Sequence, residues 1–233
     1  MNTTIDDVLR FWFGPAAATN ADEFGAKMRR WYLGDADEDA AIQSRFAAAI
    51  EQALAGGLDG WAETPRGRLA LVLLLDQMTR SVYRGTARAF AGDAMAQRLA
   101  IEALESGAGW ELGFEERHFF YMPLLHAEDA SLLDRFNTLF PQALARVPEW
   151  ARPLFADGLE QGAKYRDLFA RFGRFPHRNE TLGRRSTPQE VEFLRTWEAQ
   201  RRPRAFRALV GEPAAMTSFL DSRDPADGGR RKA

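Results

Sequence analysis

The chain has 233 residues, of which 45% are hydrophobic and 27% are charged, the ordinary composition of a globular protein in water. Its formal net charge of −2 argues against a protein that coats nucleic acid or an anionic membrane. The sequence has no cysteine, which excludes disulfides, thiol nucleophiles and cysteine-ligated metals. With only three histidines, no metal site is predicted, and no cofactor is indicated.

Two features predict a soluble cytoplasmic protein. The N-terminal segment carries an acidic pair, Asp6 and Asp7, where a secretion signal would be basic. The longest apolar run, residues 69–75, is far too short to span a bilayer, so no membrane insertion is expected.

Apolar residues recur at helical spacing from the beginning of the chain. The stripe through residues 5–12 predicts a helix that Gly14 and Pro15 end. The acidic cluster 35–39 begins a second helix that runs to Leu54, because carboxylates favour the positive end of the helix dipole. Thr64 and Pro65 begin a central buried helix, with Thr64 as its N-cap, that includes the run 69–75.

The second half of the chain has the same periodicity. We expect a helix that Asp93 caps and Gly107 ends, and a helix over 115–130 that Pro123 kinks or breaks. Two more helices are expected over 131–147 and 150–171. A capping box over residues 187–190 begins the last one.

Together these elements predict an all-α fold. We expect one domain over residues 1–220, built from about eight or nine mostly antiparallel helices. Residues 221–233 are polar and rich in Gly and Pro, and a frayed tail is expected there.

Three polar segments adjoin apolar helices, and the first follows the run 69–75 directly. If the helix continues, Asp76 and Arg80 lie one turn apart, and Gln77, Arg80 and Arg84 share a neighbouring stripe. These groups either pair with each other at the edge of the core or form the floor of a ligand-binding pocket.

The second segment, residues 119–129, contains His126, Glu128 and Asp129. In a continuous helix His126 and Glu128 face opposite sides, whereas His126 and Asp129 meet three residues apart. Asp129 is therefore expected to orient the imidazole. His126 is either a structural histidine near a kink or a general base that titrates near neutral pH.

The third segment, residues 171–179, is predicted to be an ordered loop that is extended before Pro176. It presents four polar side chains: Arg174, His177, Arg178 and Asn179. In an extended chain Arg174 and Arg178 share one side, with His177 and Asn179 on the other. Because arginine binds carboxylates and phosphates through paired hydrogen bonds, the loop either caps neighbouring helices or binds an anion.

A basic stretch overlaps this loop. Residues 164–207 contain twelve Lys and Arg against five Asp and Glu. Such a surface can meet acidic partners or nucleic acid. The aromatic residues here fall at core spacing rather than on a stacking platform, so a solvated helix face is the preferred interpretation and nucleic acid is the weaker one.

Five stretches occur together in one order: VLRFWFG (8–14), RFAAAIEQALAGGLDGWAETPRGRLALVLLLDQMTR (45–80), YRGTARAFAGD (83–93), YMPLLHAED (121–129) and FGRFPHRNETLGRRSTPQE (172–190). In this combination the chain resembles the bacterial proteins grouped as DUF924, from about residue 5 to residue 197. The resemblance implies a tetratricopeptide-like all-α fold, and the family name records that no function is established.

The sequence departs from the family pattern at three places. The family has Pro-Arg-Asn after the Asp-Gln pair, where this chain has residues 78–81 with Arg80 kept. Residues 130–133 are more apolar than the glutamine-containing stretch of the family. Tyr165 stands where the family has a histidine, so an activity that needs this histidine would be absent here.

The sequence leads to two hypotheses for the function, from different classes of protein. The first is a pocket at one end of the helices, enzymatic or not, that binds an anionic small molecule while His126 or His177 moves protons. The second is a scaffold for protein–protein interaction, which rests on the tetratricopeptide-like resemblance alone. The side chains predicted to bind the ligand are Asp76, Gln77, Arg80, Arg84, Glu128, Asp129, Arg174, Arg178 and Asn179.

Overall fold

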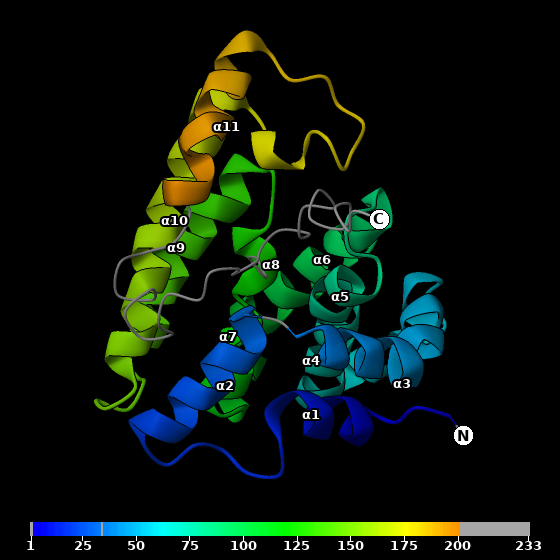
Figure 1. Cartoon of the computed structure of the whole chain (residues 1–233). Helices are drawn as coiled ribbons and strands as arrows, with labels where there is room; N and C mark the ends of the chain where they lie inside the picture. The colour runs from blue at the N-terminus through cyan, green and yellow to red at the C-terminus, as the bar shows by residue number, and fades with distance from the viewer. Residues whose placement is uncertain (1, 34, 201–233) are drawn as a thin grey trace, which may run out of the picture.

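The computed structural model describes residues 2–33 and 35–200 of the chain, without the side chains of residues 198–200. Helices and turns make up this part, which contains no strand, so the predicted all-α class is confirmed (Figure 1). The tetratricopeptide-like arrangement and the domain bounds stay predictions. The expected tail at 221–233 lies outside the described residues, as does the end of the predicted domain.

The α-helices follow one another along the chain as α1 (Ile5–Phe13), α2 (Ala21–Leu33), α3 (Ala36–Leu54), α4 (Pro65–Val72), α5 (Thr79–Val82), α6 (Asp93–Glu105), α7 (Phe114–His118), α8 (Met122–Leu125), α9 (Ala130–Leu144), α10 (Arg152–Phe172) and α11 (Pro188–Gln200). Short 3-10 turns are η1 (Asp59–Glu63), η3 (Ala87–Phe90), η4 (Ala108–Glu111) and η5 (Pro176–Arg178). A π-helical turn, η2 (Leu73–Met78), joins α4 to α5. Figure 1 shows α9, α10 and α11 on one side of the molecule and α3 to α6 on the other, with α7 and α8 between them.

Local sequence signals set most helix ends as expected. The Thr64 hydroxyl accepts the N–H of Gly67 at 3.1 Å, and Pro65 occupies the first helical position of α4. In the capping box of α11, Glu190 and Thr187 each accept the backbone N–H of the other. Gly173 ends α10 in the left-handed conformation, where glycine carries no steric penalty.

One helix, α2, is absent from the sequence prediction. Its signals were present: Asn20 accepts the N–H of Glu23 at 3.0 Å, and Phe24, Met28 and Trp31 recur on one face and are buried. Charged residues interrupt this short apolar stripe, so the helix was not predicted from the sequence alone.

The predicted helix over 115–130 is wrong. In the structure α7 ends at His118, a turn follows, and α8 covers only Met122–Leu125. Pro123 lies in the first turn of α8 rather than inside a long helix. Backbone N–H groups of the first turn have no partner within the helix, so a proline costs no hydrogen bond there. The break that Pro123 predicted is therefore present as two separate short helices.

The core gathers around α4 and η2. Every residue from Leu69 to Leu75 is buried, which confirms the central buried helix. Aromatic side chains from α1, α2 and the α7–α8 turn belong to the same core, and the rings of Trp12 and Trp31 both pack edge-on against Phe119. Among the described residues, no helix has both the length and the apolar character needed to cross a bilayer.

Candidate functional site

The buried carboxylate of Asp76, in the π-helical turn η2, is the centre of the strongest candidate site. Its oxygens lie 2.8 and 3.0 Å from Nδ1 of His126. Gln77 donates to it from Nε2 at 2.5 Å, and Nη1 of Arg80 lies 3.0 Å away. All four side chains are buried, so two of the three polar segments meet inside the protein.

Asp93 and Arg178 extend this group. Nη1 and Nη2 of Arg80 lie 2.9 and 3.0 Å from the Asp93 carboxylate, and Nη1 of Arg178 lies 3.7 Å from it. The guanidiniums of Arg80 and Arg178 also face the Phe90 ring, at 5.4 and 4.8 Å from its centroid. We call Asp76, Gln77, Arg80, Asp93, His126 and Arg178 the Asp76 cluster.

The expectation that Asp93 caps a helix is wrong. Asp93 is the first residue of α6, whose N-cap is Gly92 without a side-chain hydrogen bond. Its carboxylate instead compensates the buried Arg80, a partner that local spacing could not predict. The sequence feature that could have pointed to Asp93 as a site residue is its position as the last residue of the motif YRGTARAFAGD.

Burial and charge set the ionisation of the cluster. Burial acts to raise the pKa of Asp76, but Arg80, His126 and Gln77 outweigh it and lower that pKa to about 2. For His126, burial lowers the pKa, and the nearby guanidiniums of Arg80 and Arg178 act the same way against the opposing effect of Asp76. The imidazole is therefore neutral beside an ionised carboxylate at pH 7.

The predicted pairing of His126 with Asp129 is wrong. Because α8 ends at Leu125, the helical spacing between the two residues does not exist. Asp129 is exposed and caps α9, where it accepts the N–H of Leu132 at 3.0 Å. The residue that orients His126 is Asp76, and the Nε2 atom of His126 is buried without a hydrogen-bond partner in the described part of the chain.

Glu128 fixes the third polar segment in place. It accepts the backbone N–H of Phe175 at 2.7 Å and two hydrogen bonds from Arg184 at 2.6 and 2.8 Å. Arg84 lies in a different region, where it pairs with Asp39 of α3. Both predicted ligand-binding residues therefore hold parts of the chain together.

Only Arg178 of the third segment reaches the Asp76 cluster. Arg174 binds Glu190 through two hydrogen bonds of 2.7 and 2.8 Å, and Asn179 donates to Ser186 at 3.0 Å. The ring of His177 stacks on Trp197 at 4.9 Å. The predicted extended alternation is wrong after Phe175, because Pro176–Arg178 forms the 3-10 turn η5 and buries Arg178.

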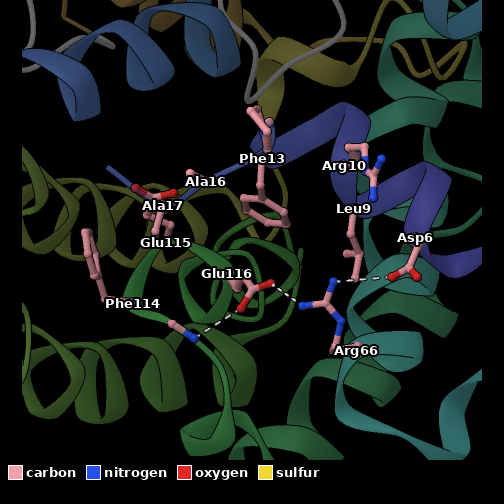
Figure 2. A pocket seen from close by; sticks show the side chains of 13 residues that line it. Asp6, Leu9, Arg10, Phe13, Ala16, Ala17, Arg66, Phe114, Glu115 and Glu116 are labelled. Carbon is pink, nitrogen blue, oxygen red and sulfur yellow. Dashed lines mark hydrogen bonds and ion pairs between the residues drawn. The ribbon is translucent and has the colours of Figure 1, made fainter. Parts of the chain in front are cut away.

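A second candidate, which the sequence prediction missed, is a surface pocket of about 350 Å³ between α1 and the start of α7 (Figure 2). Its rim holds Arg66, which bridges Asp6 at 3.5 Å and Glu116 at 3.1 Å. Leu9 and Phe13 add apolar surface to its lining. None of the predicted site residues lines this pocket, and its charges are mostly compensated by one another.

Much of the basic stretch 164–207 is also compensated. Arg166, Arg174, Arg184 and Arg195 pair with Asp134, Glu190, Glu128 and Glu192 respectively. Residues 201–207 lie outside the described part. Within that part, no group of three or more His, Asp or Glu side chains is arranged to hold a metal ion.

Comparisons with known proteins place this fold in a family. The model of a family described as bacterial proteins of unknown function, DUF924, matches residues 8–197. The chain belongs to the DUF924 family. A solved structure described as a protein of unknown function, ATU0120 from Agrobacterium tumefaciens, is similar to this DUF924 chain, with 36% identity and a TM-score of 0.67. The match covers 82% of this chain and 96% of that one. Among curated proteins, none matched the chain.

Tyr165, where the DUF924 pattern suggests a histidine, lies in an aromatic group. It is buried in α10 and packs edge-on against Phe175 at 5.1 Å and against Trp197 at 6.0 Å. This position therefore adjoins the loop that carries Arg178, and in this DUF924 chain its aromatic ring supports that loop.

Proposed function

We propose that the Asp76 cluster binds a small molecule, and that Nε2 of His126 accepts a hydrogen bond or a proton from a hydroxyl or amino group of that molecule. One observation carries the proposal: this buried atom has no hydrogen-bond partner among the described residues. Leaving a buried polar atom unsatisfied costs about 1–3 kcal/mol, so such atoms are rare unless something binds to them.

Asp76 makes His126 suitable for this role. The carboxylate accepts the Nδ1–H, which fixes the tautomer with its lone pair on Nε2. The lowered pKa of His126 keeps the imidazole neutral, and therefore able to accept, at pH 7. Once a proton reached Nε2, the ionised Asp76 would stabilise the imidazolium, so the pair can act as a general base.

An anionic group on the ligand is the second part of the proposal. Arg178 is the residue that the third polar segment contributes to the Asp76 cluster; it is buried, and its Nη1 lies 3.7 Å from the Asp93 carboxylate. Because a guanidinium can hold a carboxylate or phosphate by two parallel hydrogen bonds, Arg178 would bind the negative group while His126 contacts the hydroxyl or amino group.

Native mass spectrometry of freshly purified protein tests the proposal, together with a thermal-shift screen of small carboxylates and phosphate monoesters. The test variant is His126→Asn, which keeps an N–H donor toward Asp76 and removes Nε2. We expect a retained molecule, or a ligand-induced rise in melting temperature, in the wild type and its loss in His126→Asn, since binding only to the folded state raises stability.

Asp129→Ser is the matched control. It changes an exposed residue three positions away and keeps a hydroxyl that can cap α9. This variant should bind as the wild type does. A ligand that His126→Asn retains with unchanged affinity would contradict the proposal, as would a ligand that Asp129→Ser loses.

A further inference from the structure

The guanidinium of Arg117, in α7, is buried without a carboxylate to compensate its charge. Arg117 is 7% exposed and forms no ion pair in the described part of the chain; its Nη1 donates to the carbonyl of Leu112 at 3.3 Å. The ring of Trp110 covers one face of the guanidinium, with 4.2 Å between the guanidinium carbon and the ring centroid. A buried charge is normally paired, as Arg80 is with Asp76, and an aromatic face offsets only part of the cost.

Tyr121 is a second buried polar side chain without a partner. It lies in the turn between α7 and α8 and is 2% exposed, and its hydroxyl forms no hydrogen bond with any described residue. Burial raises the pKa of Tyr121 to about 12, against the opposing effect of the nearby Arg117. The hydroxyl is therefore protonated at pH 7 and can donate a hydrogen bond.

A cavity of about 70 Å³ joins these two side chains. Arg117 and Tyr121 both line it, together with the ring of Trp110 and the apolar side chains of Leu104 and Leu139. A water molecule needs about 10–15 Å³ of such volume, so the cavity can hold a group of several heavy atoms but not a large ligand.

We propose that this cavity binds a monovalent anion, either a chloride ion or a short carboxylate, which Arg117 holds by its charge and Tyr121 by a hydrogen bond. Only one positive charge lines the cavity, because Arg146, 3.9 Å from the centroid of the Trp110 ring, is not part of the lining. A single negative charge therefore compensates the site, and hydrogen bonds from a guanidinium to an anion are the stronger kind. The site shares no residue with the Asp76 cluster, so it stands or falls independently of the function proposed above.

Thermal unfolding at constant ionic strength tests the site, since an anion that binds only the folded state raises the melting temperature. Sodium gluconate, whose anion is too large for the cavity, is replaced stepwise by sodium acetate or by sodium chloride. Tyr121→Phe is the test variant because it removes the hydroxyl and keeps the buried ring. Tyr83→Phe is the matched control, since Tyr83 is a half-buried tyrosine that donates to Glu51 and does not line the cavity.

We expect a saturable rise in melting temperature in the wild type and in Tyr83→Phe. Binding should be at least ~10-fold weaker in Tyr121→Phe, because a hydrogen bond to a charged group is lost. Arg117→Met, which removes the charge, should abolish the response to either anion whatever its own stability.

The two salts separate the two kinds of anion. Saturation at a lower concentration of acetate than of chloride assigns the cavity to a short carboxylate, and the reverse order assigns it to chloride. Equal melting temperatures of the wild type in all three salts would overturn the site. An undiminished response in Tyr121→Phe or in Arg117→Met would overturn it too, because the anion would then bind elsewhere.

Discussion

The imidazole of His126 lies 2.8 Å from the carboxylate of Asp76, although 50 positions separate the two residues in the chain. The contact joins the turn η2 to the residue that follows α8, and both side chains are buried. This pair links the ionisation of the cluster to the stability of the fold.

Replacing Asp76 by Asn should destabilise the protein strongly. The change leaves the guanidinium of Arg80, which is 1% exposed, with one carboxylate instead of two. Removing one partner of a buried ion pair typically costs about 3–5 kcal/mol. Because Asp93 still compensates Arg80, we expect a loss of stability near the lower end of this range. Urea denaturation at pH 7 measures it.

Asp6→Asn is the control for that measurement. Asp6 pairs with Arg66 at 3.5 Å, but its side chain is 76% exposed, so its loss should cost no more than about 1 kcal/mol. Comparable losses in the two variants would mean that Asp76 is not the charge that compensates Arg80.

Acidification from pH 7.5 to 5 should reduce the free energy of unfolding, partly through His118. Burial lowers the pKa of this histidine to about 3, and burial also lowers the pKa of His126. In the unfolded chain both histidines titrate near pH 6.5, so below about that pH the unfolded state binds more protons than the folded state. The contribution of the two neutral histidines to the free energy of unfolding is thus present above about pH 6.5 and is lost as pH falls below it.

The slope from His118 alone approaches about 1.4 kcal/mol per pH unit below pH 6. Urea denaturation of the wild type and of His118→Gln across this range measures it. The variant loses the contact with Tyr32 and should be less stable throughout, but its pH dependence should be shallower. Parallel curves would show that His118 binds protons equally in the folded and unfolded states, which would contradict its lowered pKa.

Gly92→Ala should destabilise the region around the Asp76 cluster. A Cβ atom at Gly92 would lie 2.3 Å from the carbonyl oxygen of Leu75, a backbone atom that cannot move aside alone. Forcing such a clash costs about 1–3 kcal/mol or more. Thermal unfolding measures it, with Gly60→Ala as control.

At Gly60 a Cβ atom would meet no other atom within 4 Å, and the φ angle is not in the left-handed region. The control should therefore change stability by about 0.5 kcal/mol or less. If Gly92→Ala is as stable as Gly60→Ala, the backbones of η2 and α6 are not packed as closely as described.

Glu190→Gln should loosen the loop that carries Arg178. Hydrogen bonds from Arg174 lower the pKa of Glu190 to about 2, against about 4.5 without them. The stabilisation is therefore present above about pH 4.5 and disappears as pH falls toward 2. A pair of hydrogen bonds between charged groups is worth about 1.5–3 kcal/mol at pH 7.

Glu192→Gln, two residues further on, is the control. Glu192 pairs with Arg195, but both side chains are about 70% exposed, so its loss should cost less than about 0.5 kcal/mol. Equilibrium unfolding at pH 7 and pH 3 compares the two variants. A Glu190→Gln penalty that persists undiminished at pH 3 would rule out the charge of Glu190 as its cause.

The sequence predicted those parts of the fold that depend on neighbouring residues. Thr64, Thr187 and Gly173 act on backbone groups within a few positions, so helix starts and ends could be placed without knowing the rest of the molecule. The helix over 115–130 failed because the prediction placed Pro123 inside a helix, when it begins one.

In the candidate site, too, contacts between residues close in sequence were predicted and contacts between distant residues were not. Asp76 and Arg80, one turn apart, were predicted to share a helix face, and their side chains form an ion pair. The partner of His126 was not predicted, because the nearest candidate in sequence, Asp129, caps a helix, whereas Asp76 approaches through tertiary packing. The pairing of Asp93 with Arg80 was not predicted either. An aspartate at the start of a helix is already explained by the helix dipole, so its sequence gives no reason to look for a distant partner.

The π-helical turn Leu73–Met78 makes the site sensitive to chain length as well as to residue identity. Such a turn accommodates one residue more than a regular α-helical turn. Deleting a single leucine from it would leave a helix of nearly unchanged composition and apolar character. Such a deletion would turn the π-helical turn into a regular α-helical one and leave Arg80 facing Asp93. Each residue turns a helix by about 100°, so the insertion of a further residue, which the wide turn cannot absorb, would rotate Arg80 away from Asp93. The cluster is thus expected to tolerate the loss of one residue here but not the gain of one.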